Sequence, residues 1–217
     1  VSLWAIPECN PMSKANLTLD EVVAMLDRVA DKIIASEPEL SEADRNIGDG
    51  DHGLGMQRGL TAAKEKLAEG GCPSIDKAFM AVGTAMMSSM GGASGAIFGT
   101  LFRAGGKALK GQEVFDSAGL ATFLQAAVQG VQDRGKAEVG DKTVVDAMVP
   151  AAEKAKGTSE GNLTEALAAA ADAAEGGKEA SKDMVAKFGR AKTLGDGAVG
   201  HPDAGALSFT IIMQAMR

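Results

Sequence analysis

Residues 18–38 read TLDEVVAMLDRVADKIIASEP, and this stretch decides the fold class. Thr18 and Glu21 have the spacing of a capping box, in which each side chain satisfies a free backbone N–H at the start of a helix. Apolar residues then recur at helical spacing, at Val22, Leu26, Val29 and Ile33. The pattern predicts an amphipathic helix that ends before Pro38, because proline cannot donate to the helical ladder.

The same signals recur along the chain. They predict helices over about 56–67, 74–86, 96–109, 117–133, 141–155, 163–175, 178–188 and 204–216. Strand signals are weak, because the chain has no Tyr, only 4% aromatic residues and no run that alternates apolar and polar residues. The sequence therefore predicts an all-α single domain, and its short connections favour an antiparallel helical bundle or closed barrel.

The composition is that of a globular domain. Of the 217 residues, 45% are hydrophobic, which is enough for one core. The formal net charge of -7, without a basic stripe, would repel a phosphate backbone and argues against a nucleic-acid partner. No apolar run approaches the roughly 20 residues of a membrane span, and two cysteines are too few for a disulfide framework. We expect a cytoplasmic protein with no membrane partner, in which residues 1–11 are a disordered tail or linker and residues 12–217 are the domain.

Three glycine-rich polar loops interrupt the helices and are candidate functional segments. They read DRNIGDGDHGLG at 44–55, MGGASG at 90–95 and GDGAVGHPDAGA at 195–206. A single glycine-rich connection is usually only a turn. Together, however, these loops hold both histidines of the chain, His52 and His201, and most of the clustered aspartates, which favours a shared site.

The first loop carries three carboxylates, Asp44, Asp49 and Asp51. Side by side they would repel one another, and a hard divalent cation such as Mg²⁺ removes that repulsion and can also bind substrate phosphates. The alternative is that these aspartates only cap helices in a solvated turn. The G-x-G-x-x-G glycines of this loop follow no strand, which argues against a Rossmann site, and Leu60 stands where an EF-hand needs its closing carboxylate.

The second loop leads from Gly91 directly into a helix, so free backbone N–H groups and the helix dipole can face an anion. It is a candidate phosphate cradle, although it can also be a simple tight connection between helices. No Gly-Lys-Ser/Thr follows a glycine loop, which excludes a P-loop NTPase. Arg190, just before the third loop, is the candidate cation for a transferring phosphoryl group, and the ordinary alternative is an exposed arginine at a helix end.

Four stretches of the chain resemble the signature segments of one family. They are IGDGDHGLGMQRG at 47–59, MSSMGGASGAIFGTLF at 87–102, RGKAEVGDKTVVDAMVP at 134–150 and GHPDAGALS at 200–208. In this order they resemble the nucleotide-binding L subunit of dihydroxyacetone kinase, the DhaL family, or the L domain of fused dihydroxyacetone kinases.

The resemblance implies an eight-helix antiparallel barrel that holds a Mg-nucleotide, ADP or ATP, in loops at one end. By position it implies that Asp44, Asp49 and Asp51 bind magnesium, as two ions, and that Asp49 and Arg190 carry the chemistry. It places the nucleotide contacts at His52, Gly53, Leu54, Gly55, Ala93, Ser94, Gly135, Thr143, Val144, Arg190, Asp203, Ala204 and Gly205. Catalysis at such a site rests on positioning and on neutralising charge.

The resemblance also implies partner proteins. In the family, a separate K subunit or domain (DhaK-like) holds dihydroxyacetone through a covalent bond to a histidine, and the L part delivers the γ-phosphoryl group. We therefore expect the isolated chain to bind nucleotide but to phosphorylate nothing on its own. Either ADP stays bound and is rephosphorylated by a phosphohistidine protein of the phosphotransferase system (DhaM-like), or ATP exchanges as a substrate.

Two positions depart from the family pattern: Gly55 stands where Asn is common, and Ala204 stands where Pro is usual. These departures leave open a sister kinase for another small ketose such as an erythrulose. A nucleotide-loaded regulatory module that does not turn over is a further alternative. A plain helical scaffold would bind neither nucleotide nor Mg²⁺.

Overall fold

The computed structural model describes residues 14–217, so the tail or linker predicted for residues 1–11 lies outside the described residues. Within the described range the chain forms nine α-helices, two 3-10 helices and one antiparallel two-stranded ribbon. The α-helices are α1 (Leu19–Ala35), α2 (Glu37–Ile47), α3 (His52–Ala68), α4 (Ile75–Ser89), α5 (Gly92–Ala108), α6 (Ser117–Gly135), α7 (Val145–Gly157), α8 (Leu163–Ala180) and α9 (Ala204–Met216). The 3-10 helices are η1 (Ser181–Asp183) and η2 (Arg190–Ala198), and the strands are β1 (Asn16–Leu17) and β2 (Phe115–Asp116).

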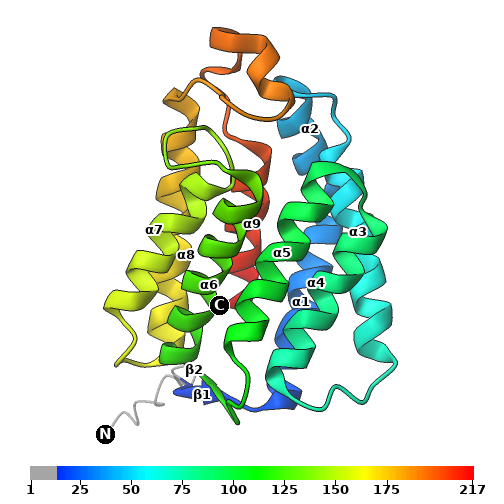
Figure 1. The fold of residues 1–217 in the computed structure, drawn as a ribbon, viewed down its shortest axis with the longest axis vertical. Helices are drawn as coiled ribbons and strands as arrows, with labels where there is room; N and C mark the ends of the chain where they lie inside the picture. The colour runs from blue at the N-terminus through cyan, green and yellow to red at the C-terminus, as the bar shows by residue number, and fades with distance from the viewer. Residues whose placement is uncertain (1–13) are drawn as a thin grey trace, which may run out of the picture.

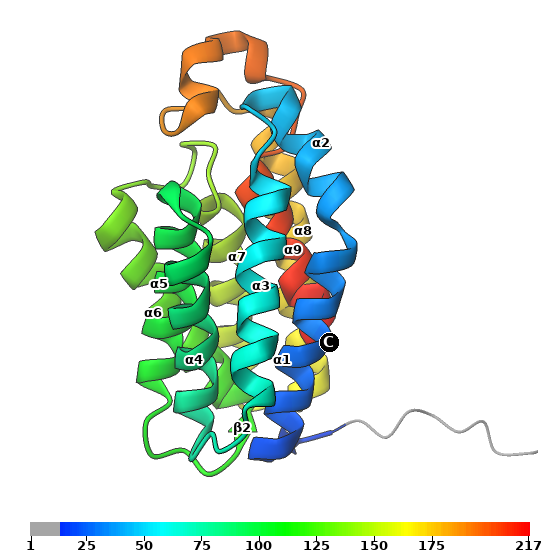
Figure 2. The same cartoon turned by 90° about the vertical axis from the view of Figure 1, so that its right-hand side faces the viewer.

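By their contacts, eight of these helices form a closed ring, which can be followed in Figures 1 and 2. α1 packs on α3, each helix from α3 to α8 packs on the next one, and α9 packs back on α1. Neighbouring helices run in opposite directions, and α2 lies outside the ring at its upper end, against α3 and α9. For the described part of the chain, the prediction of an all-α, eight-helix antiparallel barrel is confirmed.

The core of the barrel is built from apolar helix faces that approach closely. Val22, Leu26, Val29 and Ile33, whose spacing predicted the first helix, are all buried, and Thr18 and Glu21 form the capping box. Glycines allow α4 and α5 to come together: a Cβ at Gly83 would lie 2.6 Å from the carbonyl oxygen of Gly99. No side chain larger than hydrogen fits at that contact, so the two backbones pack directly on each other.

One correction concerns residues 37–47, for which the sequence predicts no helix. They form α2, and Pro38 stands in its first turn, where proline is tolerated because the N–H that it lacks would be free in any case. Pro38 therefore begins a second helix after the first has ended. As a result Asp44 lies on the last turn of a helix, and α3 begins at His52 and not at Met56.

The helix predicted over 178–188 is wrong. α8 instead continues to Ala180. Gly177 does not end this helix: it is glycine because α8 packs closely on α7 there, where a Cβ would lie 2.1 Å from the carbonyl oxygen of Asp146. The chain then passes through η1 and η2 over the upper end of the ring, where it is orange in Figure 1. The helix predicted from residue 141 begins only at Val145.

All three glycine-rich segments meet at the upper end of the ring (Figures 1 and 2). The alternating helix directions bring them there, since every second connection returns to the same end. The lower end carries the β1–β2 ribbon and short turns. Among the described residues, none of the helices is long and apolar enough to cross a membrane.

Candidate active site

The upper end of the barrel contains a cavity of about 510 Å³. Its walls come from the α2–α3 connection, the starts of α5, η2 and α9, and the end of α6 with the loop that follows it. A cavity of this size is within the range of small-molecule sites, which mix apolar walls with a few converging polar groups.

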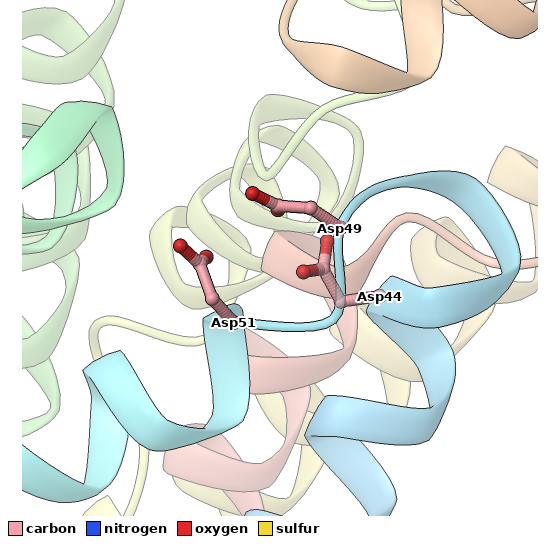
Figure 3. A group of neighbouring side chains, drawn as sticks. All are labelled: Asp44, Asp49 and Asp51. Carbon is pink, nitrogen blue, oxygen red and sulfur yellow. The ribbon is translucent and has the colours of Figure 1, made fainter.

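Three carboxylates converge on one side of this cavity (Figure 3). Asp44 comes from the last turn of α2, Asp49 from the short connection and Asp51 from the residue that precedes α3. One oxygen from each lies within 4.8 Å of the others. Gly50, with φ of +78°, allows the tight turn between them, and the backbone N–H of His52 donates to Asp44 Oδ2 at 3.2 Å. Such a cluster of like charges, with only oxygen donors, suits a hard divalent cation.

Arg190 supplies positive charge beside the carboxylates. It is the first residue of η2, and its Nε lies 2.9 Å from Asp49 Oδ2. The Arg190 side chain is 69% exposed, so the pair adds little to stability, and the guanidinium remains accessible to a ligand in the cavity. Arg190 is therefore an exposed arginine at a helix end, and it also lies beside the cavity, where a cation can act on a phosphoryl group.

His52 is buried and connects the carboxylate side to α5 and α9. Its Nδ1 lies 3.3 Å from Ser94 Oγ, and its Nε2 lies 2.8 Å from Ser208 Oγ. Burial lowers the pKa of His52, although the charges of Asp44 and Asp51 oppose that shift. A neutral imidazole between two hydroxyls fixes the Ser94 side chain at the cavity wall. Ser208 lies on an apolar helix, and nothing in the sequence pattern singled it out.

The start of α5 forms the next wall. Gly91 and Gly92 have φ of +73° and +60°, so the chain turns sharply into the helix, and Ala93 and Ser94 line the cavity. A helix N-terminus presents free N–H groups and the positive end of the helix dipole. This arrangement can receive an anion, as the second glycine loop predicts.

Another wall is formed by two segments: the loop that follows α6 and the connection that leads into α9. Asp146 is buried and accepts hydrogen bonds from the backbone N–H groups of Gly140 and Thr143, at 2.6 and 2.7 Å. Asp203 caps α9 through Oδ2, which accepts from the Ala206 N–H at 2.8 Å. Burial raises the pKa of Asp203 to about 7, Asp146 adds to the shift, and the positive charge of Lys142 opposes it.

The remaining wall is apolar, and sequence reasoning missed it. Its members come from α5, α6, the following loop and the segment before η2: Ile97, Phe98, Val131, Ala137 and Phe188. On the helices, such residues have the same spacing as core residues, so the sequence pattern could not separate them from the barrel core. Arg58, Met90 and Lys142 also line the cavity, and the sequence analysis assigned no role to them.

The structure brings together nearly all residues that the sequence assigned to magnesium and nucleotide. All of them line the cavity except Gly53 and Leu54. Gly53 faces α2, where a Cβ would lie 2.4 Å from the carbonyl oxygen of Glu37, and Leu54 is 48% exposed. The side chain of His201 does not line the cavity, and its carbonyl oxygen accepts a hydrogen bond from Lys142.

Comparisons with known proteins identify the family of this chain. Residues 46–217 match the family model described as the DAK2 domain. The chain is 37% identical over 203 residues to the PEP-dependent dihydroxyacetone kinase, ADP-binding subunit DhaL, of Escherichia coli (strain K12), covering 93% of this chain and 97% of that protein. It is 35% identical over 222 residues to the L-erythrulose kinase of Pectobacterium atrosepticum, covering 99% of this chain but 37% of that longer protein.

Solved structures with the same fold include the native dihydroxyacetone kinase of C. freundii. The TM-score is 0.72 at 22% identity, over 99% of this chain and 38% of that one. The same enzyme in complex with AMP-PNP and Mg²⁺ gives a TM-score of 0.69 at 23% identity, over 99% of this chain and 37% of that one. With the family model and the 37% identical relative, we conclude that this chain belongs to the DAK2 domain family, which includes the DhaL subunits of dihydroxyacetone kinases.

Proposed function

We propose that this protein is a Mg-nucleotide-binding phosphotransfer subunit, which passes a phosphoryl group to dihydroxyacetone or a similar small ketose held by a separate K-like subunit. The observation that carries the proposal is the convergence on one cavity of three carboxylates, a helix N-terminus and an arginine. Phosphoryl transfer needs these groups: metal ligands, N–H donors for phosphate oxygens and a cation for the transferring group.

The carboxylates of Asp44, Asp49 and Asp51 would hold Mg²⁺, and we propose two ions. The donor set fits, because all three residues offer oxygen, one oxygen of each lies within 4.8 Å of the others, and the adjoining cavity leaves room for phosphate oxygens and water as further ligands. Bound Mg²⁺ neutralises phosphate charge and polarises the phosphoryl group. Asp49 also lies next to Arg190, which links the carboxylates to the first residue of η2.

The other residues of the cavity would bind and orient the nucleotide. The N–H groups at Ala93 and Ser94 would receive phosphate oxygens, and His52 would keep the Ser94 hydroxyl in place. The apolar wall that includes Val131 and Phe188 would take the base. Arg190, exposed beside Asp49, would stabilise the charge that develops on the transferring phosphoryl group.

Exposed apolar side chains around the cavity support a protein partner at this end. Among the described residues, the exposed large apolar side chains are Leu54, Val114, Val139, Val185, Phe188, Leu194 and Val199. All except Val114 belong to the segments at the upper end of the ring. Apolar side chains that gather on one face are typical of protein contacts. A K-like subunit docked there would present its ketose to the bound nucleotide.

We propose that ADP stays bound through turnover and is recharged by a phosphohistidine protein. A small apolar cluster of Ile47, Ala186, Ala191, Ala198 and Ala204 anchors the η2 segment beside the cavity, and such a cover would slow nucleotide release. Several relatives are ADP-binding subunits of PEP-dependent dihydroxyacetone kinases, which favours the same mode. An ATP-consuming kinase for an erythrulose is the alternative, and its support is the similarity to erythrulose kinases.

The first experiment is to purify the protein, denature it and identify any released nucleotide. Near-stoichiometric ADP supports the permanent cofactor. Protein without nucleotide that is stabilised reversibly by Mg-ATP supports the exchanging substrate. If neither nucleotide is present and neither raises the melting temperature with Mg²⁺, the proposed function is wrong.

The second experiment separates an enzyme from a regulatory module. Asp49→Asn removes one metal ligand and its charge, and we expect phosphoryl transfer to a K-like subunit to fall by at least about a hundredfold while binding of that subunit persists. The wild-type chain assayed without a K-like subunit is the control, and it should phosphorylate no ketose. If the wild-type chain binds that subunit but transfers no phosphoryl group, the regulatory module is favoured. Full activity of Asp49→Asn would refute the role of Asp49 as a metal ligand.

A further inference from the structure

Lys142 is a buried lysine at the edge of the cavity to which the proposed function assigns no role. Only 1% of the residue is exposed, and its backbone φ is +57°, in the left-handed region. Burying an ammonium group removes its hydration, and the left-handed region is uncommon for residues other than glycine. Both features are unfavourable in isolation, so the contacts that Lys142 makes must compensate for them.

The ammonium group of Lys142 joins two segments that are distant in the sequence. Its Nζ donates to the carbonyl oxygen of Ser181 at 2.5 Å and to that of His201 at 2.6 Å. Ser181 begins η1, and His201 lies in the connection between η2 and α9. The hydroxyl of Ser181 also accepts a hydrogen bond from the backbone N–H of Asp203 at 3.0 Å. Three segments at the upper end of the barrel are therefore tied together at one point.

The partners of the ammonium are carbonyl oxygens and not carboxylates. Burial lowers the pKa of Lys142, while the carboxylates of Asp203, Asp146 and Asp183 act at longer range to keep it charged. A charged donor makes stronger hydrogen bonds to carbonyl oxygens than a neutral donor does. The lysine thus acts as a cross-link between backbones, with carboxylates around it that balance its charge.

The segments that Lys142 ties together are two walls of the cavity. Thr143 and Val144 follow it directly, and the Asp203–Gly205 segment follows the connection that holds His201. The two walls touch, since a Cβ at Gly205 would lie 3.3 Å from Val144 Cβ. A shift of either wall by an ångström would change the shape of the cavity, and tight sites tolerate little of this.

We propose that Lys142 is a positioning residue of the nucleotide site: it fixes the Thr143–Val144 wall against the Asp203–Gly205 wall and acts through them, without contacting the nucleotide. The inference rests on the proposed function, because it assumes that a nucleotide occupies the cavity. It adds a residue to which the sequence analysis assigned no role, although Lys142 lies within the segment 134–150 that resembles the family.

Lys142→Met tests the proposal, because methionine has a similar length but neither charge nor donors. Lys136→Met is the matched control: Lys136 lies at the other end of the same loop, is also left-handed, with φ of +59°, and is exposed. We expect Lys142→Met to weaken Mg-ADP binding by at least about tenfold, and Lys136→Met to weaken it by less than about twofold. Binding is measured calorimetrically at a temperature where circular dichroism finds each variant fully folded.

Hydrogen exchange distinguishes a positioning role from a general effect on folding. In Lys142→Met we expect amides in residues 140–146 and 199–206 to lose protection, while α1 and α4 keep wild-type protection. Protection lost throughout the barrel would overturn the proposal, and so would Mg-ADP binding equal to that of Lys136→Met.

A milder variant keeps the test decisive if Lys142→Met does not fold. Ser181→Ala removes the hydroxyl that accepts from Asp203 but leaves the rest of the junction, and we expect it to weaken Mg-ADP binding by about threefold or more. Unchanged binding in Ser181→Ala would then overturn the proposal. Failure of the wild-type protein to bind Mg-ADP at all is a different result, since it would refute the proposed function itself.

Discussion

Gly53 and Gly55 lie two residues apart in α3, but the space around their Cα atoms differs. At Gly53 a Cβ would lie 2.4 Å from both the Glu37 carbonyl oxygen and Ser41 Oγ, so α3 and α2 could not pack as they do. At Gly55 the only neighbour of a Cβ would be Met90 Cε, at 4.0 Å. Gly55 therefore leaves room for a Cβ. The packing of α2 on α3 requires glycine at position 53. The assignment of Gly53 as a nucleotide contact stays a prediction.

This contrast predicts opposite effects of the same substitution. Gly55→Ala should raise the free energy of unfolding by about 0.5–1 kcal/mol, because alanine loses less backbone entropy in a helix than glycine does. Gly53→Ala should lower it by about 1–3 kcal/mol, because the added methyl overlaps α2. Urea unfolding of both variants checks this. If Gly53→Ala is as stable as the wild type, the close approach of α2 and α3 is wrong.

Asp203 predicts a pH dependence of stability. Its pKa is raised from 3.8 to about 7 in the folded protein, so between these values the folded state holds a proton that the unfolded chain has released. This contribution is fully present below pH 3.8 and is lost as the pH rises through 7. From pH 5.5 to 7.5 we expect the wild type to lose up to about 2 kcal/mol of unfolding free energy relative to Asp203→Asn.

Asparagine is a suitable control side chain because it keeps the helix cap at the start of α9 without titrating. The measurement is urea unfolding of both proteins at the two pH values. A difference between the proteins that is the same at both pH values would mean that Asp203 does not hold a proton near neutrality.

At the scale of elements, the ring helices were predictable and the segments over the cavity were not. The apolar periodicity of α1 was sufficient to predict this helix, because a helix in a closed ring buries one continuous face. α2 carried a signal too, in the buried positions Leu40, Ala43 and Ile47, but Pro38 was interpreted only as a stop. The segment 184–203 is held by contacts with distant residues, which no local pattern contains. The loop around residues 136–144 combines such contacts with local hydrogen bonds to Asp146.

The candidate site divides in the same way, into residues that a local sequence pattern reveals and residues that only contacts across the fold bring together. The three aspartates were predictable because they lie within one short stretch of sequence. The junction at Lys142 was not, because its partners are 39 and 59 residues away.

Residues 184–198 at the upper end of the ring, which include η2, form a lid over the cavity, and one of their contacts gives a prediction at the scale of elements. Lys187 Nζ donates to Asp141 Oδ1 at 2.7 Å, and the Lys187 backbone N–H donates to the Asp141 carbonyl at 3.1 Å. The side-chain bond to Lys187 is also the main cause of the lowered pKa of Asp141. Lys187→Ala should therefore loosen the segment before η2 and raise the dissociation rate of a fluorescent ADP analogue by about threefold to tenfold.

Lys192→Ala removes an exposed lysine of the same lid and is the control. Stopped-flow displacement of the analogue by excess ADP measures both rates. Equal rates for the two variants would contradict the prediction that Lys187 holds the lid.

At the scale of the whole molecule, the closed ring predicts cooperative unfolding. Each ring helix has two neighbours, and α9 closes the ring against α1, so no subset of helices forms a core by itself. We expect a single thermal transition whose calorimetric and van't Hoff enthalpies agree, and we expect Mg-ADP to move that transition upward as one unit. Two separate transitions within the ring would contradict this.

The lower end of the ring lies away from the cavity. The turn between α3 and α4 lies at that lower end, where Gly70 and Gly71 have φ of +73° and +75° and face open space. A connection of this kind tolerates insertions, because few packed atoms depend on its course. The turn is therefore a natural attachment point: a peptide tag or a dye inserted there could tether the protein to a surface or report on its rotation, with the cavity left free to receive its partners.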